Sequence, residues 1–284
     1  MDEVAANSPP DEEAAPGLSV IIPTLNEARS IGRTLDAVLR AAPGAEVIVV
    51  DGGSRDGTAE AARTRGVKVI TSARGRGAQM HAGACAARGR ALWFLHADTL
   101  PSVECAGLMA EALGDPSVVA GNFHVLFDGG ARAARFLTWL YPRLRRLGLC
   151  YGDSGIFVRR EAYIRLGGFR AFPIFEDLDL VRRLRKSGRV AHLPAAVTTS
   201  SRRFEGRSFA LTFARWSLLQ ALYWLGVHPE TLGRMYAPVR VGGARRKSTD
   251  GAEQKSVDRA KRESGGSPRL DVKRAQADAG SEEA

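Results

Sequence analysis

Two spacings of apolar residues alternate along the first part of this chain. Short runs that are almost wholly apolar, such as 18–23 and 46–51, are typical of strands buried on both faces of a sheet. Between them, 27–40 places Ile31 and Leu35 on one helical face, which is typical of a helix packed on a core. This alternation predicts parallel βαβ units whose ligands bind at the carboxyl ends of the strands.

The same patterns predict the elements of the whole ordered part. The predicted strands are 18–23, 46–51, 67–71, 91–96, 118–127, 154–158 and 190–204, and the predicted helices are 27–40, 56–65, 75–88, 131–147, 175–186 and 208–227. The last helix approaches membrane-spanning length, but Ser, Thr, Gln and Arg interrupt it. We therefore expect a packed or interfacial helix rather than a span.

Both ends of the chain differ from this pattern. Residues 1–17 are rich in Ala, Pro, Asp and Glu, and 241–284 alternates Lys and Arg with Asp, Glu and small residues. These compositions predict a disordered leader and a disordered charged tail around one domain at 18–240. The leader lacks the basic start and the apolar run of a signal peptide, which favours the cytoplasm.

Charge and cysteine content narrow the partners and the compartment. The net charge of the chain is +10, and 18–240 holds 31 basic against 18 acidic residues. Such a basic body suits a phosphorylated substrate, an anionic membrane surface or nucleic acid, although a merely solvated basic surface also fits. Cys85, Cys105 and Cys150 form no CxxC pair or disulfide ladder, so we expect a reducing compartment.

Polar residues at the predicted strand ends are the candidates for chemistry. Asp51 closes an apolar strand, and the Gly52-Gly53 pair after it lets the backbone approach a ligand. A carboxylate at this place can bind a ribose or a base. An ordinary strand–turn–helix junction with Asp56 as helix cap explains the same residues.

A second strand end carries Asp98, with His96 two positions before it. An aspartate after a fully apolar strand needs a partner, and hard cations such as Mg²⁺ and Mn²⁺ take oxygen ligands and bridge to substrate phosphates. His96 would orient the carboxylate or bind the metal itself. The alternative is that Asp98 or Thr99 caps a helix beginning near Pro101.

One acidic cluster and several basic residues are further candidates, for a general base and for phosphate binding respectively. Glu176, Asp177 and Asp179 open a predicted helix, where they either cap it or, as adjacent acids in a cleft, raise each other's pKa and provide a general base. Arginine side chains match phosphate oxygens, so the basic residues near the third predicted strand and the Arg202-Arg203 pair are candidates for binding a phosphate group. Most surface arginines, however, bind no ligand. The candidates are Lys68, Arg74, Arg76, Arg202 and Arg203.

The order of these motifs resembles family-2 glycosyltransferases of the GT-A type. The segments that carry the resemblance are Ser19-Val20-Ile21-Ile22-Pro23-Thr24-Leu25-Asn26-Glu27, Val50-Asp51-Gly52-Gly53-Ser54-Arg55-Asp56-Gly57-Thr58, Phe94-Leu95-His96-Ala97-Asp98, Gly152-Asp153-Ser154-Gly155 and Glu176-Asp177. More narrowly, 96–99 together with 199–205 resembles a small bacterial branch with His-Ala-Asp in place of the DxD motif. The implied fold is α/β: one Rossmann-like, mainly parallel mixed sheet flanked by helices, with a C-terminal helical region.

The resemblance implies an inverting transfer of one sugar from a UDP- or GDP-type donor to a hydroxyl acceptor, either a small molecule or lipid-linked. Asp177 would be the base beside Glu176, and Asp98 with His96 would bind Mn²⁺ or Mg²⁺. The expected donor-binding residues are Pro23, Thr24, Asn26, Glu27, Asp51, Gly53, Ser54, Arg74, Arg76 and Gly77, and the expected acceptor or diphosphate residues are Gly152, Asp153, Arg202 and Arg203. The Gln-x-x-Arg-Trp motif of processive members is absent, so we expect non-processive transfer.

Two other classes compete with this interpretation. A sugar-1-phosphate nucleotidyltransferase shares the layout, but its Gly-rich phosphate loop is replaced here by 23–27. A nucleic-acid-binding domain would cluster exposed aromatics with basic residues. The four tryptophans lie in apolar segments and are expected in the core, so no nucleic acid is predicted as partner.

The late apolar helix also suggests a surface for membranes. Six apolar residues recur in it at helical spacing, namely Phe209, Phe213, Trp216, Leu219, Tyr223 and Val227. An arginine-rich segment, 132–146, lies earlier in the chain. This combination suits peripheral attachment to anionic lipid at the inner membrane face, or else both helices simply cover the sheet.

Overall fold

The computed structural model describes residues 17–129, 132–146, 151–201 and 208–236. All of them belong to one compact unit of the chain. The predicted leader, apart from Gly17, and the predicted tail lie outside the described residues, and so do the candidate residues Arg202 and Arg203.

The described strands form one mixed, mainly parallel sheet. They are β1 (Leu18–Thr24), β2 (Glu46–Asp51), β3 (Lys68–Thr71), β4 (Ala91–Phe94), β5 (Thr99–Pro101), β6 (Val118–Phe127), β7 (Phe157–Arg159) and β8 (Arg189–Thr199), in the order β3-β2-β1-β4-β7-β6-β8-β5. Strands β1 to β4 pair in parallel, whereas β7 runs antiparallel to both β4 and β6. The carboxyl ends of β1, β2 and β4 therefore meet at one edge of the sheet.

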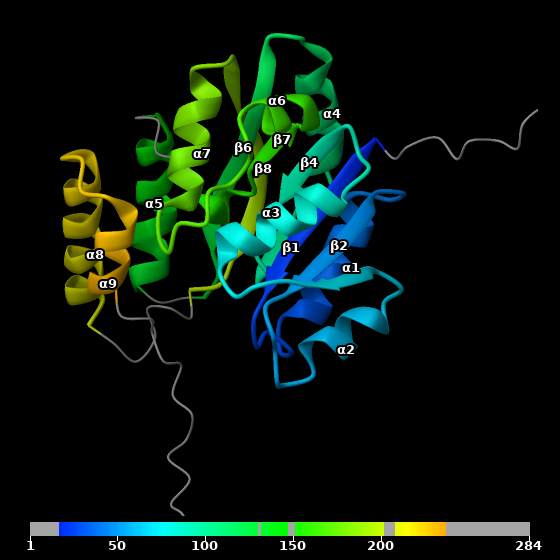
Figure 1. The fold of residues 1–284 in the computed structure, drawn as a ribbon, viewed down its shortest axis with the longest axis horizontal. Coiled ribbons are helices and arrows are strands. Elements are labelled where there is room, and N and C mark those ends of the chain that lie inside the picture. Colours follow the sequence, from blue (N-terminus) through cyan, green and yellow to red (C-terminus); the bar gives the residue numbers. More distant parts are fainter. Residues whose placement is uncertain (1–16, 130–131, 147–150, 202–207, 237–284) are drawn as a thin grey trace, which may run out of the picture. The chain divides into compact units, whose positions relative to one another are not determined.

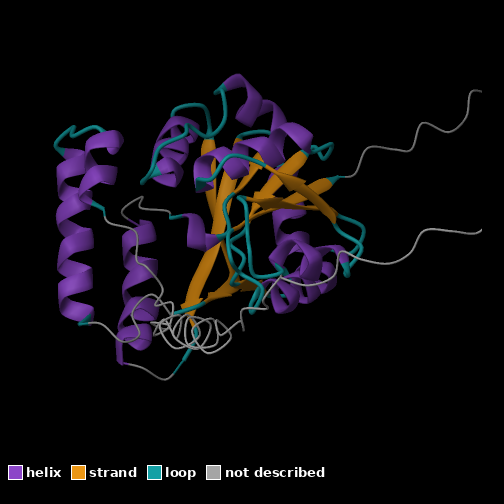
Figure 2. Cartoon of the chain, turned by 60° about the horizontal axis from the view of Figure 1, so that its bottom comes forward, coloured by secondary structure: helices purple, strands orange, loops and turns teal. Residues whose placement is uncertain are grey.

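Helices cover both faces of this sheet (Figure 1). They are α1 (Ile31–Ala41), α2 (Thr58–Arg63), α3 (Arg76–Ala86), α4 (Cys105–Gly114), α5 (Arg132–Arg146), α6 (Arg160–Arg165), α7 (Glu176–Arg185), α8 (Phe209–Trp224) and α9 (Pro229–Met235), with a 3₁₀ turn η1 (Gly152–Ser154). Successive β1 side chains enter opposite cores, as the strand period requires: Val20 packs with Leu35 of α1, and Ile21 packs with Met80 of α3. Figure 2 shows the strands between these helix layers. The predicted α/β fold class is confirmed.

A third apolar cluster joins the C-terminal helices to the rest. Leu219 of α8 and Leu232 of α9 pack with Tyr151, Phe175 and Leu178. Helix α5 lies beside β6, so α5, α8 and α9 form a helical group at one end of the sheet (Figure 1). This group contacts η1 and the start of α7, which matters for the site described below.

The structure corrects two predicted elements. No helix begins near Pro101: Thr99–Pro101 is β5, paired with β8, and the next helix begins at Cys105. The proposal that Asp98 or Thr99 caps a helix is therefore wrong. The predicted strand 154–158 begins only at Phe157, because the preceding residues form the turn η1.

The expectation that all four tryptophans are buried is also wrong. Trp93 is fully buried, but Trp139 and Trp224 are 52% and 62% exposed. Apolar neighbours in a helix sequence therefore did not mean burial at these two positions. In the part of the chain that the structure describes, no helix is long and apolar enough to cross a membrane.

Candidate active site

The loop after β2 wraps around the carboxylate of Asp51. Asp51 ends β2 opposite Thr24 of β1 and is 4% exposed. Its Oδ2 accepts the backbone N–H groups of Gly53 (3.0 Å) and Ser54 (2.9 Å), and the Thr24 hydroxyl donates to Oδ1 (3.3 Å). Burial raises the pKa of Asp51, but the hydrogen bonds outweigh it and leave the pKa below its ordinary value. Asp51 is therefore a fixed anion at this strand end.

The loops after β1 and β2 are joined to each other by hydrogen bonds. The backbone N–H of Asn26 donates to Ser54 Oγ (2.9 Å), and the N–H of Arg55 donates to Asn26 Oδ1 (2.9 Å). Asn26 takes the left-handed conformation, with φ of 56°, which asparagine tolerates better than most residues. The N–H of Glu27 donates to Thr58 Oγ1 (2.8 Å). The structure thus brings together the predicted residues Thr24, Asn26, Glu27, Asp51 and Ser54.

Asp56 belongs to this loop junction as well. It accepts the N–H of Thr58 at the start of α2 (3.1 Å) and the N–H of Ala28 from the other loop (3.1 Å). The N-cap of α2 is Gly57, not Asp56 as the sequence suggested, but the Asp56 carboxylate still accepts the first N–H of the helix and ties the two loops together.

Gln79 of α3 supports these loops, and the sequence analysis missed it. It is 3% exposed, and its Nε2 donates to the carbonyls of both Thr24 and Val50, each at 2.8 Å. It also lies against Gly52, where an added Cβ would meet its side-chain amide at 3.1 Å. The available signal was a glutamine among small residues on a helix that the fold must place against β1 and β2.

Glu176 and Asp177 open α7 as buried carboxylates. They are 2% and 7% exposed. Asp177 Oδ2 accepts the N–H of Gly152 in η1 (2.5 Å), and its Oδ1 accepts the N–H of Leu178 (2.7 Å). Glu176 pairs with Arg76 at the start of α3 (2.9 Å). Helix α7 therefore connects helix α3 to the turn η1.

The electrostatics of this pair favour a protonatable Asp177. Burial and the adjacent Glu176 carboxylate raise its pKa from 3.8 to about 6, against the opposing effects of Arg76 and the backbone donors. The Glu176 carboxylate in turn raises the pKa of Arg76, so this guanidinium stays charged. A carboxylate with a pKa near neutrality is suited to general base catalysis.

His96 meets Asp177 across Gly152. A Cβ added to Gly152 would lie 2.9 Å from His96 Nε2 and 3.3 Å from Asp177 Oδ2, so only glycine leaves this space open. His96 and Asp98 are both half-buried at the end of β4. The structure therefore brings His96 of the predicted metal pair and the predicted base Asp177 to the same turn.

The remaining acids have structural partners. Asp179 pairs with Arg170 (3.2 Å) and Arg183 (2.8 Å), which makes it a support of α7. Asp153 accepts the hydroxyl of Tyr141 from α5 (2.9 Å). Of the three acids that open α7, Asp177 alone is held against η1.

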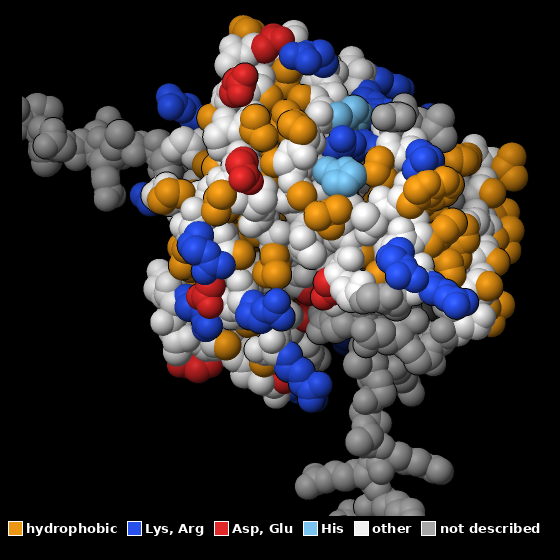
Figure 3. Space-filling model, turned by 180° about the vertical axis from the view of Figure 1, so that it is seen from behind, with side chains coloured by type: hydrophobic (Ala, Val, Ile, Leu, Met, Phe, Trp, Pro, Cys, Tyr) orange, Lys and Arg blue, Asp and Glu red, His pale blue; other side chains and the backbone are white. Residues whose placement is uncertain are grey.

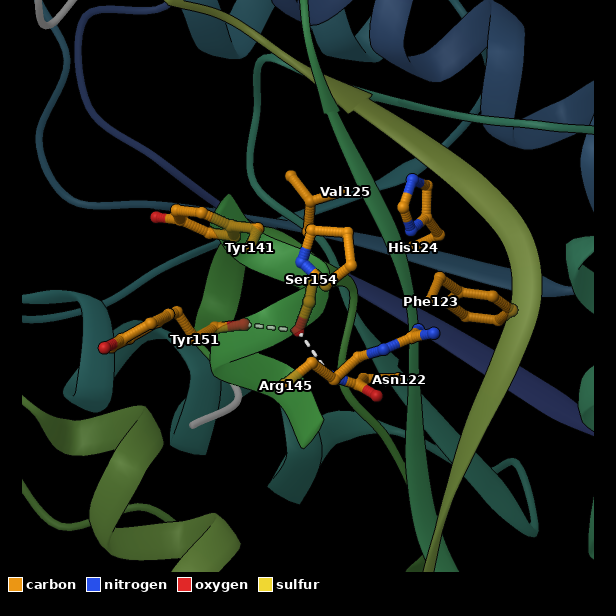
Figure 4. Close-up of a pocket in the computed structure, with 9 residues that line it drawn as sticks. Asn122, Phe123, His124, Val125, Tyr141, Arg145, Tyr151 and Ser154 are labelled. Atoms are coloured by element: carbon orange, nitrogen blue, oxygen red, sulfur yellow. Dashed lines mark hydrogen bonds between the residues drawn. The ribbon is translucent and has the colours of Figure 1, made fainter. Parts of the chain in front are cut away.

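A buried network of hydrogen bonds connects η1 to strands β6 and β8. Asn122 of β6 donates to Ser154 Oγ (3.1 Å), and Ser154 donates to the Tyr151 carbonyl (2.5 Å). Figure 4 shows Ser154 between these partners in a small pocket that Arg145 also lines. His192 of β8 lies 2.8 Å from Asn122 Oδ1. This network, of which Asn122 was not predicted, fixes the turn that presents Gly152 to Asp177.

Three further residues considered from the sequence lie away from the contacts described above. Gly77 lies where α3 crosses the loop before α7, and an added Cβ there would be 2.5 Å from the Arg170 carbonyl. Arg74 is exposed. Lys68 begins β3 and donates to the Ala86 carbonyl (3.1 Å), at the opposite end of that strand from the site.

Comparison with known proteins gives a family and a fold. The family model described as Glycosyl transferase family 2 matches residues 19–170. No curated protein matches this sequence.

Similar solved structures include three with nucleotide ligands. Mannosyltransferase PcManGT from Pyrobaculum calidifontis, in complex with GDP-Man and Mn²⁺, has a TM-score of 0.57 at 24% identity, over 75% of this chain and 64% of that one. S. aureus TarS in complex with UDP-GlcNAc has a TM-score of 0.53 at 16% identity, over 68% and 60%. Glucosyl-3-phosphoglycerate synthase from Mycobacterium tuberculosis, in complex with Mn²⁺, UDP and glucosyl-3-phosphoglycerate, has a TM-score of 0.53 at 21% identity, over 75% and 81%. The chain thus spans less than two thirds of the first two.

Proposed function

We propose a function for this chain, which belongs to glycosyl transferase family 2. In this proposal it moves one sugar from a nucleoside diphosphate sugar to a hydroxyl group, with inversion at the anomeric carbon. The observation that carries the proposal is Asp177. It is a buried carboxylate whose pKa is raised to about 6, held against the turn η1 where the strand ends meet. The rival nucleotidyltransferase interpretation has no comparable support, because the family model that matches is that of transferases of glycosyl groups.

The donor would bind over the joined loops after β1 and β2. The Asp51 carboxylate, held as an anion at this strand end, would accept a hydroxyl of the ribose or an N–H of the base. Three similar structures hold GDP-Man, UDP-GlcNAc or UDP, which supports a donor of the UDP or GDP type. Arg76, at the start of α3, would face the diphosphate.

The residues fit a divalent cation held jointly with the donor. Within the described ranges, no three His, Cys, Asp or Glu side chains are grouped to hold a metal by themselves. Mg²⁺ is usually bound by one or two carboxylates together with substrate phosphates, and Asp98 offers such an oxygen. When bound, Mn²⁺ or Mg²⁺ would neutralise charge on the diphosphate. We further propose that the chain belongs to the small bacterial branch with His-Ala-Asp in place of DxD, on the strength of His96 and Asp98 in its sequence.

The reaction follows from the position of Asp177. Its carboxylate takes the proton of the acceptor hydroxyl while that oxygen attacks the anomeric carbon from the face opposite the diphosphate. The bond from the anomeric carbon to the diphosphate oxygen breaks, and the proton stays on Asp177. Gly152 keeps open the space beside the carboxylate, and Asp153, fixed by Tyr141, would face the acceptor.

The remaining parts of the proposal concern context. The transfer is non-processive, 18–240 is the catalytic domain between a leader and a tail, and no nucleic acid takes part. Cys85 and Cys105 are free thiols, which suits a reducing, cytoplasmic compartment.

Two measurements test this function. Thermal shift with UDP-, GDP-, ADP- and CDP-sugars, with and without Mn²⁺, should show stabilisation by one UDP- or GDP-type donor, because a ligand bound only by the folded state stabilises it. Asp177→Asn should then keep donor binding but lower transfer by about 10²–10⁴-fold, the usual contribution of a general base. A loss below tenfold would remove Asp177 as base and turn attention to Glu176 or Asp153.

A further inference from the structure

Helix α8 is apolar on two opposite faces. Its inner face carries Trp216, Leu219 and Tyr223, which pack on Phe175 and Tyr151. These residues belong to the stripe that was predicted to face lipid, and they face the protein instead. They pack on the segment before η1 and on the start of α7 rather than on the sheet.

The outer face of α8 is apolar as well, and it is exposed. Leu211, Leu218 and Trp224 are 72%, 57% and 62% exposed, and Leu225 directly after the helix is 82% exposed. A helix that is apolar all round is normally buried on all sides. This face therefore calls for a covering partner.

Helix α5 extends the same surface with exposed aromatic residues. Phe136 and Trp139 are 40% and 52% exposed and stack on each other, and Phe136 contacts Phe209 and Phe213 of α8 edge to face. We call Phe136, Trp139, Leu211, Leu218, Trp224 and Leu225 the α5–α8 surface. Figure 3 shows apolar side chains gathered at the right-hand side of the molecule, with basic side chains among them.

The charged residues within α5 and α8 are all of one sign. Arg132, Arg135, Arg143 and Arg215 are exposed, and neither α5 nor α8 contains an acidic residue. The Arg143 guanidinium lies 3.8 Å above the Trp139 ring, which holds a positive charge beside an exposed aromatic side chain. Tryptophan beside arginine on an apolar face is typical of a protein surface at the headgroup level of a bilayer.

We propose that the α5–α8 surface docks on an anionic lipid bilayer. A symmetric dimer through this face would bring its arginines against one another, which is repulsive. The segment 241–284 offers only Val241, Val257, Leu270 and Val272 as large apolar side chains to cover it. Single-stranded nucleic acid binds to stacking aromatic rings, whereas the exposed residues of α8 are mainly alanine and leucine, with Trp224 as the one aromatic residue among them.

The docking surface adjoins the proposed site. Tyr141 of α5 donates to Asp153, and Trp216 of α8 packs on Tyr151 next to η1. If the proposed transfer is correct, on which this consequence alone rests, the acceptor hydroxyl belongs to a lipid-linked molecule presented at the membrane surface.

Vesicle binding of the full chain tests the docking surface independently of any activity. The protein should sediment with vesicles containing phosphatidylglycerol at low salt and leave them at high salt, because exposed charges are screened. Vesicles of phosphatidylcholine should retain little of it. The fluorescence of the exposed Trp139 and Trp224 should shift to the blue on binding, and brominated lipid should quench it.

Matched variants separate this surface from general basicity. Arg132→Gln/Arg135→Gln/Arg143→Gln should weaken vesicle binding about 100-fold, since each arginine near the surface contributes about fivefold. The control Arg40→Gln/Arg90→Gln/Arg165→Gln removes three exposed arginines elsewhere and should change binding less than fivefold. In the same way Leu218→Gln/Trp224→Gln should abolish the fluorescence shift, whereas Val103→Gln/Ile164→Gln, at residues 63% and 60% exposed, should not.

Three results would overturn the proposal. One is failure to sediment with vesicles of any composition. Another is equal loss of binding in the surface variants and their controls. The third is a dimer, or a complex with single-stranded nucleic acid, that the surface variants abolish while vesicle binding is unchanged.

Discussion

Removing the charge of Glu176 should move the acidic limb of the pH–rate profile to lower pH. The limb reflects ionisation of Asp177, because a general base works only as the carboxylate. Glu176 raises the pKa of Asp177 and Arg76 lowers it, so Glu176→Gln deletes the raising charge and leaves the lowering one in place. The pKa of Asp177 must then fall from about 6.

The expected size follows from the burial of both carboxylates. A neighbouring charge shifts a pKa by about 1–3 units, and Arg76 shares its charge between the two acids, so we expect a fall of about one unit, or about 1.4 kcal/mol. At pH 5 the ionised fraction of Asp177 should rise from about one tenth to about one half. Relative to its own plateau at pH 8, the activity of the variant at pH 5 should therefore increase about fivefold.

The reverse substitution provides the matched control. Arg76→Gln removes the lowering charge and should move the same limb to higher pH. Nucleoside diphosphate release from the identified donor, measured as kcat/KM between pH 4.5 and 8.5, gives both profiles. Asp177→Asn should lack the limb, and His96→Asn tests whether the neighbouring imidazole contributes a limb of its own. Shifts of the two variants in the same direction would refute the assignment of the limb to Asp177.

Three further substitutions test the site in other ways. Asp177→Asn should raise the free energy of unfolding by up to about 3 kcal/mol at pH 8. The pKa of Asp177 is raised from 3.8 to about 6, so the folded state binds the proton more tightly than the unfolded state does. The wild-type protein therefore loses stability as the pH rises through this range, and the variant does not. Urea unfolding at pH 4 and pH 8 measures it, and an equal difference at both would contradict it. Gly152→Ala should lower transfer by about 10–100-fold, since its Cβ would press on His96 and Asp177, and a kcat near the wild-type value would show that η1 yields freely. Gln79→Leu should cost about 1–3 kcal/mol, because the buried carbonyls of Thr24 and Val50 each lose one of their donors. The comparison in the same denaturant assay is Gln220→Leu, whose Nε2 has no partner in the described part of the chain and whose Oε1 accepts the Tyr151 hydroxyl at 3.4 Å. Equal costs would exclude the bridging role.

The strand ends could be predicted because each depends on a short stretch of sequence. An apolar run followed by Asp51-Gly52-Gly53 is recognisable locally, and the parallel order then places Asp51 beside Thr24. The same reasoning failed near Pro101, where capping residues and a proline were compatible with a helix. This segment forms a strand because it pairs with β8, almost a hundred residues away, and the local sequence contains no signal of that pairing.

The meeting of His96, Gly152 and Asp177 was beyond a local analysis for a related reason. Each residue was a candidate by its motif, but their encounter requires β7 to insert antiparallel between β4 and β6, which brings η1 to the carboxyl end of β4. Gln79 is a further case: its amide acts on two backbone carbonyls, and backbone partners carry no signature in the sequence. The residues proposed to do the chemistry were therefore easier to find in the sequence than the residues that hold them in place.

Helix α8 shows why an apolar pattern alone does not decide what a surface does. The predicted stripe and the exposed face both recur at helical spacing, and only the packing of Trp216 and Leu219 on η1 and α7 tells which face is turned inward. Once that face is fixed, the exposed face has to be explained by its surroundings. The arginines of α5 supply those surroundings, because they turn an apolar face, which by itself fits any hydrophobic partner, into one that selects an anionic one.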